Sequence, residues 1–296
     1  MFKVSLVPAL PAALLAALAA PLLAVQPVAA LGSDADLSVT QLAAQLRHDD
    51  ANVITAMDQI SRLQQAQSSN LVVRLDQPLQ LGHMQLAFRI AARQEQTDIY
   101  LLAGEPVTER AVEAVLPDAL AAQVRDAAGA LRAIWRLAEV DDITNIHPHF
   151  VRDYTKSLPI PNLVGLYQNA AGHYGMNWSY LAAINYVETD FGRVLGPSVT
   201  GAEGPMQFEP ATWSEYGSGS IMSPNDAISA AAKYLKANGA PGQMAQAVYA
   251  YNPTWDYVEG VSRYAAVIRR DPSWYARLYF WSTAERGDAT LSVPLG

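Results

Sequence analysis

Residues 181–192 read Leu-Ala-Ala-Ile-Asn-Tyr-Val-Glu-Thr-Asp-Phe-Gly and place one carboxylate on the apolar side of a helix. Leu181 and Ile184 repeat at helical spacing, and Glu188 lies on their side of the helix. Gly192 suits the left-handed conformation that ends many helices. Burial and the negative end of the helix dipole both disfavour a charged carboxylate, so we expect the pKa of Glu188 to be raised. General acid catalysis requires such a protonated group, although a half-exposed glutamate paired with a base is the alternative.

The composition predicts a folded protein with an acidic balance. Of its 296 residues, 51% are hydrophobic and 16% are charged, which indicates a sizeable buried core in one large or two modest domains. The formal net charge of -8 argues against a nucleic-acid partner and against electrostatic adhesion to anionic surfaces, because both need clustered Lys and Arg. Cysteine is absent, which excludes disulfides, thiolate metal sites and lipid attachment through a thiol.

The first thirty residues are typical of an export signal. Lys3 is the only charged residue before Asp34, and an almost wholly apolar run follows it. Small residues at 28–30 suit a signal peptidase, so cleavage after residue 30 is the favoured interpretation. If the run stays uncleaved, it is long enough to tether the protein to a membrane. Either way the protein is expected in the cell envelope (periplasm or cell wall) or secreted.

Residues 31–140 are expected to form a helical accessory domain, for which docking, spacer and purely structural roles are all open. A helix over 37–67 is predicted by four apolar residues that recur every seven positions, namely Val39, Leu46, Val53 and Ile60. Asp49 interrupts the neighbouring stripe, which favours a small bundle over an isolated coiled coil. Further helical patterns cover 84–92 and 118–138, and Thr108 is a suitable helix start.

A domain boundary is predicted between residues 141 and 161, where Asp and Pro residues concentrate. Few contacts should cross such a linker, so a chain beginning near Asp142 is expected to fold alone. His147 and His149 flank a proline without a third ligand nearby, and no metal site is predicted there. A catalytic domain is expected over 162–285, followed by a tail over 286–296.

The C-terminal half is expected to be made of short helices. Two cover 162–175 and 177–190, and a third opens at Ser223-Pro224 and closes at Asn238-Gly239. Further helices are predicted over 244–251 and 255–270. The fold class predicted for the whole chain is therefore all-α, with at most a minor β element.

Three segments of this half place a polar group among aromatic residues. They are Val187-Glu188-Thr189, Gly204-Pro205-Met206-Gln207-Phe208 and Tyr249-Ala250-Tyr251-Asn252-Pro253. Sugar sites combine aromatic platforms with a few amide side chains. Gln207 and Asn252 can each donate and accept a hydrogen bond, which suits an N-acetyl group.

In this order and spacing, the three segments resemble the motifs of lytic transglycosylases, peptidoglycan-cleaving enzymes of the lysozyme-like superfamily. The resemblance covers roughly residues 163–266 and implies a lysozyme-like catalytic domain. Glu188 matches the family's catalytic acid. The substrate-binding positions that the resemblance implies are Thr189, Met206, Gln207, Phe208, Tyr251 and Asn252. Thr189 replaces the usual serine, and Glu209 stands where an apolar residue is common.

The resemblance implies an enzyme that needs no metal or cofactor and acts on peptidoglycan glycan strands. Glu188 would protonate the bond between N-acetylmuramic acid and N-acetylglucosamine, and would then act as the base that closes an anhydro ring. Asp190 lies about 200° further round the helix and should point away, while Glu203 and Asp226 stay open as cleft residues. The alternatives are a hydrolytic muramidase on the same fold and a non-catalytic cell-wall binder or scaffold.

Overall fold

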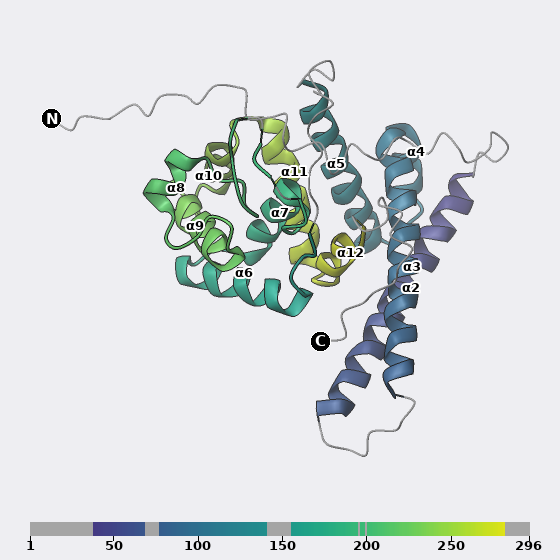
Figure 1. Ribbon diagram of the computed structural model, residues 1–296. Helices are drawn as coiled ribbons and strands as arrows, with labels where there is room; N and C mark the ends of the chain where they lie inside the picture. Colours follow the sequence, from purple (N-terminus) through teal and green to yellow (C-terminus); the bar gives the residue numbers. More distant parts are fainter. Residues whose placement is uncertain (1–37, 69–76, 141–154, 195, 199, 282–296) are drawn as a thin grey trace.

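The protein folds as an assembly of helices (Figure 1). The computed structural model describes residues 38–68, 77–140, 155–194, 196–198 and 200–281, and within these no strands pair into a sheet. One isolated bridge joins Glu203 to Phe208, so the all-α prediction is confirmed. The helices are α2 (Val39–Ser68), α3 (Gln77–Gly104), α4 (Pro106–Glu113), α5 (Asp118–Val140), α6 (Ile160–Tyr174), α7 (Trp178–Thr189), α8 (Pro210–Tyr216), α9 (Pro224–Ala237), α10 (Met244–Tyr251), α11 (Trp255–Arg270) and α12 (Ser273–Trp281).

Helices with strong local signals begin and end where the sequence predicts. The side chain of Ser223 accepts a hydrogen bond from the Asp226 backbone and caps α9, and α10 and α11 have the predicted bounds. The expected start at Thr108 is wrong, because α4 begins with Pro106, whose fixed φ suits a first helical position, and Glu105 precedes it without a side-chain cap. Helices α8 and α12 were not predicted.

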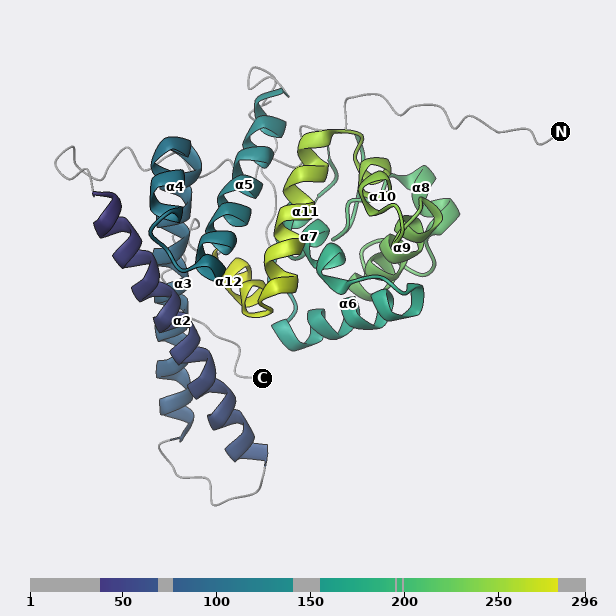
Figure 2. The same cartoon turned by 180° about the vertical axis from the view of Figure 1, so that it is seen from behind.

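A long pair of helices, α2 and α3, stands at one side of the molecule (Figures 1 and 2). The apolar heptad positions of α2 face this contact, and Leu42, Leu46, Val53 and Ala56 are buried. Asp49, which interrupts the stripe, is buried with them and lies beside Asp98 of α3.

Acidic side chains at this helix pair meet one arginine of α12. The Arg277 guanidinium is fully buried, pairs with Glu95 of α3, and lies 2.8 Å from Asp50 of α2. Burial, and after it the charge of the neighbouring Asp49, raise the pKa of Asp98 to about 7. Burial likewise raises the pKa of Glu95 to about 7, against the opposing effect of Arg277. Each carboxyl therefore binds its proton more tightly in the folded protein than in the unfolded chain.

This shift predicts that the protein loses stability as pH rises. A carboxyl whose pKa is raised by folding contributes stability that is present below its unfolded pKa and lost as pH rises through the folded value. We therefore expect a higher free energy of unfolding at about pH 5 than at about pH 8, measured by urea titration. Asp98→Asn imitates the protonated acid and should flatten this dependence. An unchanged slope in that variant would contradict the assignment.

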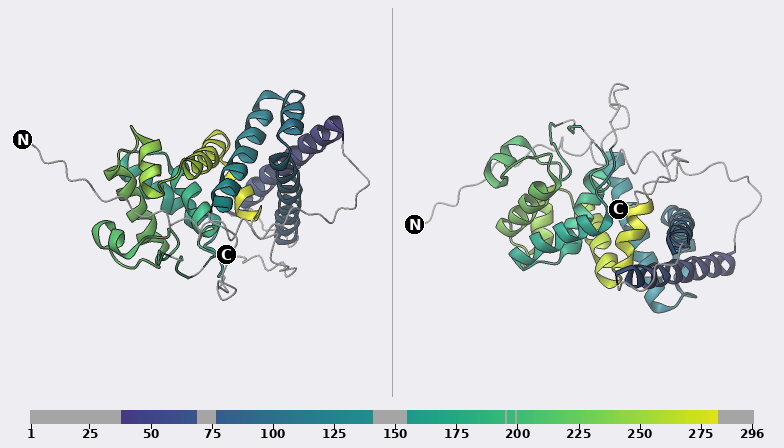
Figure 3. Two further views of the ribbon diagram at one scale, coloured as in Figure 1. Left: turned by 90° about the horizontal axis from the view of Figure 1, so that it is seen from above. Right: turned by 60° about the horizontal axis from the view of Figure 1, so that its bottom comes forward.

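The predicted accessory and catalytic regions share one hydrophobic core. Figure 3 shows the N-terminal helices lying against the C-terminal ones. Helix α5 packs along α11, and Gly260 permits the close approach, since a Cβ there would lie 2.7 Å from Ile134. Arg136 of α5 forms ion pairs with Asp256 and Glu259 of α11, both at 2.7 Å. The expectation that few contacts cross the boundary therefore fails. Residues 141–154 of the predicted linker, including both histidines, lie outside the described residues, and the domain limits themselves stay a prediction.

Helix α7 lies at the centre of the C-terminal half and is buried along most of its length (Figure 2). Asn177 caps its start by accepting a hydrogen bond from the backbone of Ser179 at 2.9 Å. Leu181 and Ile184 are fully buried, as their spacing predicts. Among the described residues, no helix has the length and apolar content needed to cross a membrane.

Candidate active site

Glu188 lies in the last turn of α7, with its side chain directed into the interior. It is 5% exposed, and its Oε1 accepts a hydrogen bond of 2.6 Å from the Tyr257 hydroxyl in α11. Burial, and after it the charge of Glu188, raise the pKa of Tyr257 well above its usual range. Tyr257 therefore stays a neutral donor and fixes one oxygen of the carboxyl. The raised pKa expected for Glu188 itself stays a prediction.

A second tyrosine, Tyr251, lies beside Tyr257 and connects the other two motif segments. The Tyr251 ring lies parallel to the Tyr257 ring, with 6.5 Å between centroids and 4° between planes. Its hydroxyl donates to the Met206 carbonyl at 2.7 Å, which ties α10 to the loop over 204–208. Tyr257 and Tyr251 thus connect segments that are far apart in the sequence: Glu188 with α11, and α10 with Met206.

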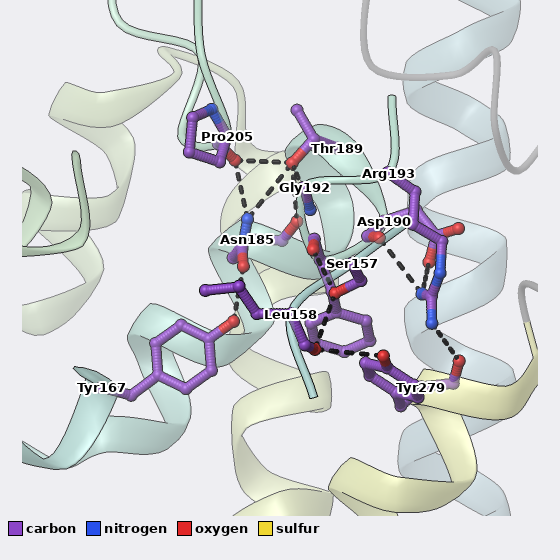
Figure 4. Close-up of polar contacts among 11 residues, drawn as sticks. Ser157, Leu158, Tyr167, Asn185, Thr189, Asp190, Gly192, Arg193, Pro205 and Tyr279 are labelled. Carbon is purple, nitrogen blue, oxygen red and sulfur yellow. Dashed lines mark hydrogen bonds and ion pairs between the residues drawn. The ribbon is translucent and has the colours of Figure 1, made fainter. Parts of the chain in front are cut away.

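The loop over 204–208 is held against α7 by polar contacts (Figure 4). The Thr189 hydroxyl donates to the Pro205 carbonyl at 2.6 Å, and the Asn185 amide donates to the same oxygen at 2.7 Å. The Tyr167 hydroxyl of α6 donates to the Asn185 side chain in turn. These buried bonds set the position of the loop relative to the turn that carries Glu188.

Gly204 is required at the start of this loop because no side chain fits there. Its φ is 75°, and a Cβ would lie 2.0 Å from the Ile221 carbonyl oxygen, a backbone atom that cannot turn aside. Gly204→Ala should therefore destabilise the protein by about 3 kcal/mol or more, combining backbone strain with the displacement of packed backbone. Thermal unfolding measures this loss. Gly165→Ala is the control, because a Cβ there meets no atom within 4 Å, and an equal loss in both variants would contradict the steric account.

The backbone after Glu188 turns left-handed at consecutive residues. Asp190 and Phe191 have φ values of 54° and 58°, and Gly192 follows at 79°. Helix α7 therefore ends at Thr189, three residues before the glycine expected to end it, and the helical rotation used to place Asp190 does not apply. The Asp190 carboxylate is buried and lies 2.9 Å from Arg193. Each non-glycine residue in this conformation costs about 1–3 kcal/mol unless surrounding contacts impose it.

The predicted substrate-binding residues differ in their access to solvent. Gln207 is partly exposed, and its amide donates to its own loop at Gly204 O, 3.0 Å away. Thr189 is fully buried and engaged with Pro205. Both polar side-chain atoms of Asn252 are buried without a hydrogen-bond partner among the described residues. Met206 and Phe208 are buried, and Phe208 packs edge-on against Tyr251.

The other acidic residues near the motif segments, Glu203, Glu209 and Asp226, are less buried than Glu188. The Thr200 hydroxyl donates to Glu209 at 2.6 Å. Glu209, which replaces the apolar residue common in the family, therefore links the loop at Thr200 to the start of α8. Asp226 accepts from the Ser220 backbone at 3.0 Å, which lowers its pKa. Glu203 is partly exposed beside Phe208, with which it exchanges backbone hydrogen bonds.

Two contacts of this site were missed from the sequence, although each had a signal. Tyr257 belongs to an aromatic-rich stretch that also contains Tyr249, Tyr251 and Trp255, but it lies beyond the motif ending at Pro253. Asn185 is the one amide within the apolar run that precedes Glu188, a position that favours a buried hydrogen-bonding role.

A cavity of about 150 Å³ lies beside the turn after Glu188. Its lining includes Lys156, Asn185, Gly192, Pro205 and Met222, but Glu188 does not line it. Within the described part of the chain, no group of three or more His, Cys, Asp or Glu residues could hold a metal ion.

Comparison with known proteins gives a match over the region that holds this site. Residues 165–260, about a third of the chain, match the family described as the transglycosylase SLT domain. Searches of curated proteins and of solved structures returned no significant match. The matched segment contains Glu188 and all the predicted substrate-binding positions, and the match confirms the resemblance that their motifs predicted.

Proposed function

We propose that residues 165–260, which match the transglycosylase SLT domain, act as a peptidoglycan lytic transglycosylase with Glu188 as the catalytic acid and base. The observation that carries this proposal is the buried Glu188 carboxyl, held at 2.6 Å by Tyr257 where the three motif segments meet. The Tyr257 hydroxyl fixes the orientation of this carboxyl, and burial favours the protonated form that a general acid needs.

The proposed reaction uses one carboxyl twice. Protonated Glu188 donates to the glycosidic oxygen as the bond from the anomeric carbon of N-acetylmuramic acid breaks. The N-acetyl oxygen of that sugar stabilises the cationic carbon, which replaces the second carboxylate of most glycosidases. The sugar's primary hydroxyl then attacks this carbon and gives its proton to Glu188, which restores the acid and closes an anhydro ring.

The motif residues support this chemistry in two ways. We assign Gln207 and Asn252 to the N-acetyl groups of the substrate. The Asn252 amide supports this, because it is buried without a partner among the described residues, and buried polar atoms normally have partners. Tyr251, Met206 and Phe208 form the wall behind Glu188 in this proposal. Thr189 contributes by fixing the loop through Pro205 rather than through an exposed hydroxyl.

Product analysis tests the proposal directly. Purified peptidoglycan digested by the protein should release muropeptides with anhydro ends, which are lighter by one water than the reducing ends made by a hydrolytic muramidase. Mass spectrometry separates these outcomes. Reducing ends would favour the muramidase alternative, and binding without any release would favour the non-catalytic binder.

The substrate class favours action outside the cytoplasm. We propose that residues 1–30 export the protein to the cell envelope, on the basis of Lys3 and the apolar run that follows it. In a bacterium with a compatible secretion system, the mature N-terminus should map near Leu31. An intact Met1 on membrane-bound protein would support the anchor instead, and full-length soluble protein in the cytoplasm would contradict both.

A further inference from the structure

One buried arginine holds Asp190, the first residue of the left-handed turn after Glu188 (Figure 4). The Arg193 guanidinium donates to the Asp190 carboxylate at 2.9 Å and to the Asp190 carbonyl at 3.2 Å. Both side chains are at least nine-tenths buried, at 7% and 3% exposed. Unfavoured backbone conformations persist only where surrounding contacts impose them, and these contacts do so for Asp190.

Arg193 is itself held by α12, which lies outside the segment 165–260 that matches the family. Its second guanidinium nitrogen donates to the Tyr279 carbonyl at 3.1 Å, within the last turn of α12, where a helix attracts cations. The guanidinium carbon also lies 4.1 Å from the centre of the Tyr279 ring. Such a contact uses the planar shape of arginine as well as its charge.

The opposite side of α12 is fixed to the N-terminal helices. Arg277 lies two residues before Tyr279, about 200° away around a helix. Its guanidinium pairs with Glu95 of α3 and Asp50 of α2, and is fully buried. Helix α12 is therefore secured on one side by α2 and α3 while its other side supports the turn after Glu188.

We propose that Arg193, supported by Tyr279 of α12, is a positioning residue that sets the orientation of the Glu188 carboxyl. The inference rests on the proposed function of Glu188. A mechanism with one carboxyl needs the same group aligned for the leaving oxygen and then for the attacking hydroxyl. An error in the turn that follows Glu188 therefore affects both steps, and a misplacement of about 1 Å can cost roughly a hundredfold in rate.

The test compares two replacements of Tyr279 in the full chain. Tyr279→Leu removes the ring beneath Arg193, whereas Tyr279→Phe keeps that ring and loses only the hydrogen bond from its hydroxyl to the Leu158 carbonyl. With soluble glycan fragments as substrate, we expect Tyr279→Leu to lower kcat about tenfold to a hundredfold with KM little changed. Tyr279→Phe should keep a kcat close to that of the unmodified protein. Arg193→Lys, which keeps the charge, should retain more kcat than Arg193→Gln.

A destabilised variant elsewhere separates positioning from folding. Leu46→Ala creates a cavity in α2, in the N-terminal helix pair, and assays run well below all unfolding temperatures. If Tyr279→Leu lost no more kcat than Leu46→Ala, or if KM rose in place of the fall in kcat, the inference would be overturned. Tyr279→Leu decides the matter even if the Arg193 variants fail to fold. An unmodified protein without turnover would refute the proposed function, and the inference with it, before any variant was compared.

Discussion

Glu188→Gln is expected to reduce turnover about ten-thousandfold or more. General acid–base catalysis is typically worth about a hundredfold to ten-thousandfold, and here one group would perform both proton transfers. The replacement keeps the size of the side chain and an oxygen that can still accept from Tyr257, whose hydroxyl lies 2.6 Å from Oε1. The loss should therefore appear in kcat for soluble glycan fragments, with an unchanged circular dichroism spectrum.

Glu203→Gln is the matched control for this prediction. It makes the same chemical change in a partly exposed carboxylate on the neighbouring loop, and its effect on kcat should be small. The sequence suggested Asp190→Asn as a harmless control. It is unsuitable, because it would leave the buried charge of Arg193 without the carboxylate that pairs with it. Near-normal turnover in Glu188→Gln, with a large loss in Glu203→Gln, would show that Glu188 is not the catalytic acid.

A chain that begins at Asp142 is expected not to fold cooperatively. It lacks α2, α3 and α5, so Arg277 would lose Glu95 and Asp50. Breaking a buried ion pair costs about 3–5 kcal/mol, and exposing the face of α11 around Gly260 adds to that. Whole proteins are stable by only about 5–15 kcal/mol. The expected observation is a broad thermal transition by circular dichroism, against a sharp one for the full chain.

A surface variant of the full chain separates the exposed ion pairs between α5 and α11 from the buried contacts that the fragment loses. Arg136→Ala in the full chain removes the ion pairs to Asp256 and Glu259 but leaves the core intact, and its side chain is 46% exposed. Exposed ion pairs contribute about 0–1 kcal/mol, so this variant should unfold almost as the full chain does. A fragment from Asp142 that melts sharply and cleaves glycan would restore the independent domain predicted from the Asp and Pro residues.

The sequence predicts local helix structure better than it predicts contacts between distant helices. The position of Glu188 follows from local periodicity with Leu181 and Ile184, and the bounds of α9 follow from the capping pattern at Ser223-Pro224, because both depend on near neighbours. The Tyr257 contact spans 69 residues, so no local pattern contains it. The helical rotation used to orient Asp190 does not apply, because α7 ends at Thr189 and Asp190 is left-handed.

Long-range burial explains the larger errors about organisation. Helix α12 carries aromatic or aliphatic side chains on all sides, so its sequence lacks the one-sided pattern by which helices are recognised. Arg277 is a charged residue at a fully buried position, which hydrophobicity alone does not predict, since its partners come from α2 and α3. The linker over 141–161 stays a prediction from composition, and composition carries no information about the helix faces of α5 and α11 that meet.

Digestion in water enriched with heavy oxygen tests most directly whether one carboxyl cleaves the glycan without adding water. Water would enter the product of a muramidase, whereas the proposed reaction uses the sugar's own hydroxyl. Mass spectrometry of the released N-acetylmuramic acid ends should therefore show anhydro products without heavy oxygen, and Glu188→Gln should release none. Reducing ends that each carry one heavy oxygen atom would contradict the account.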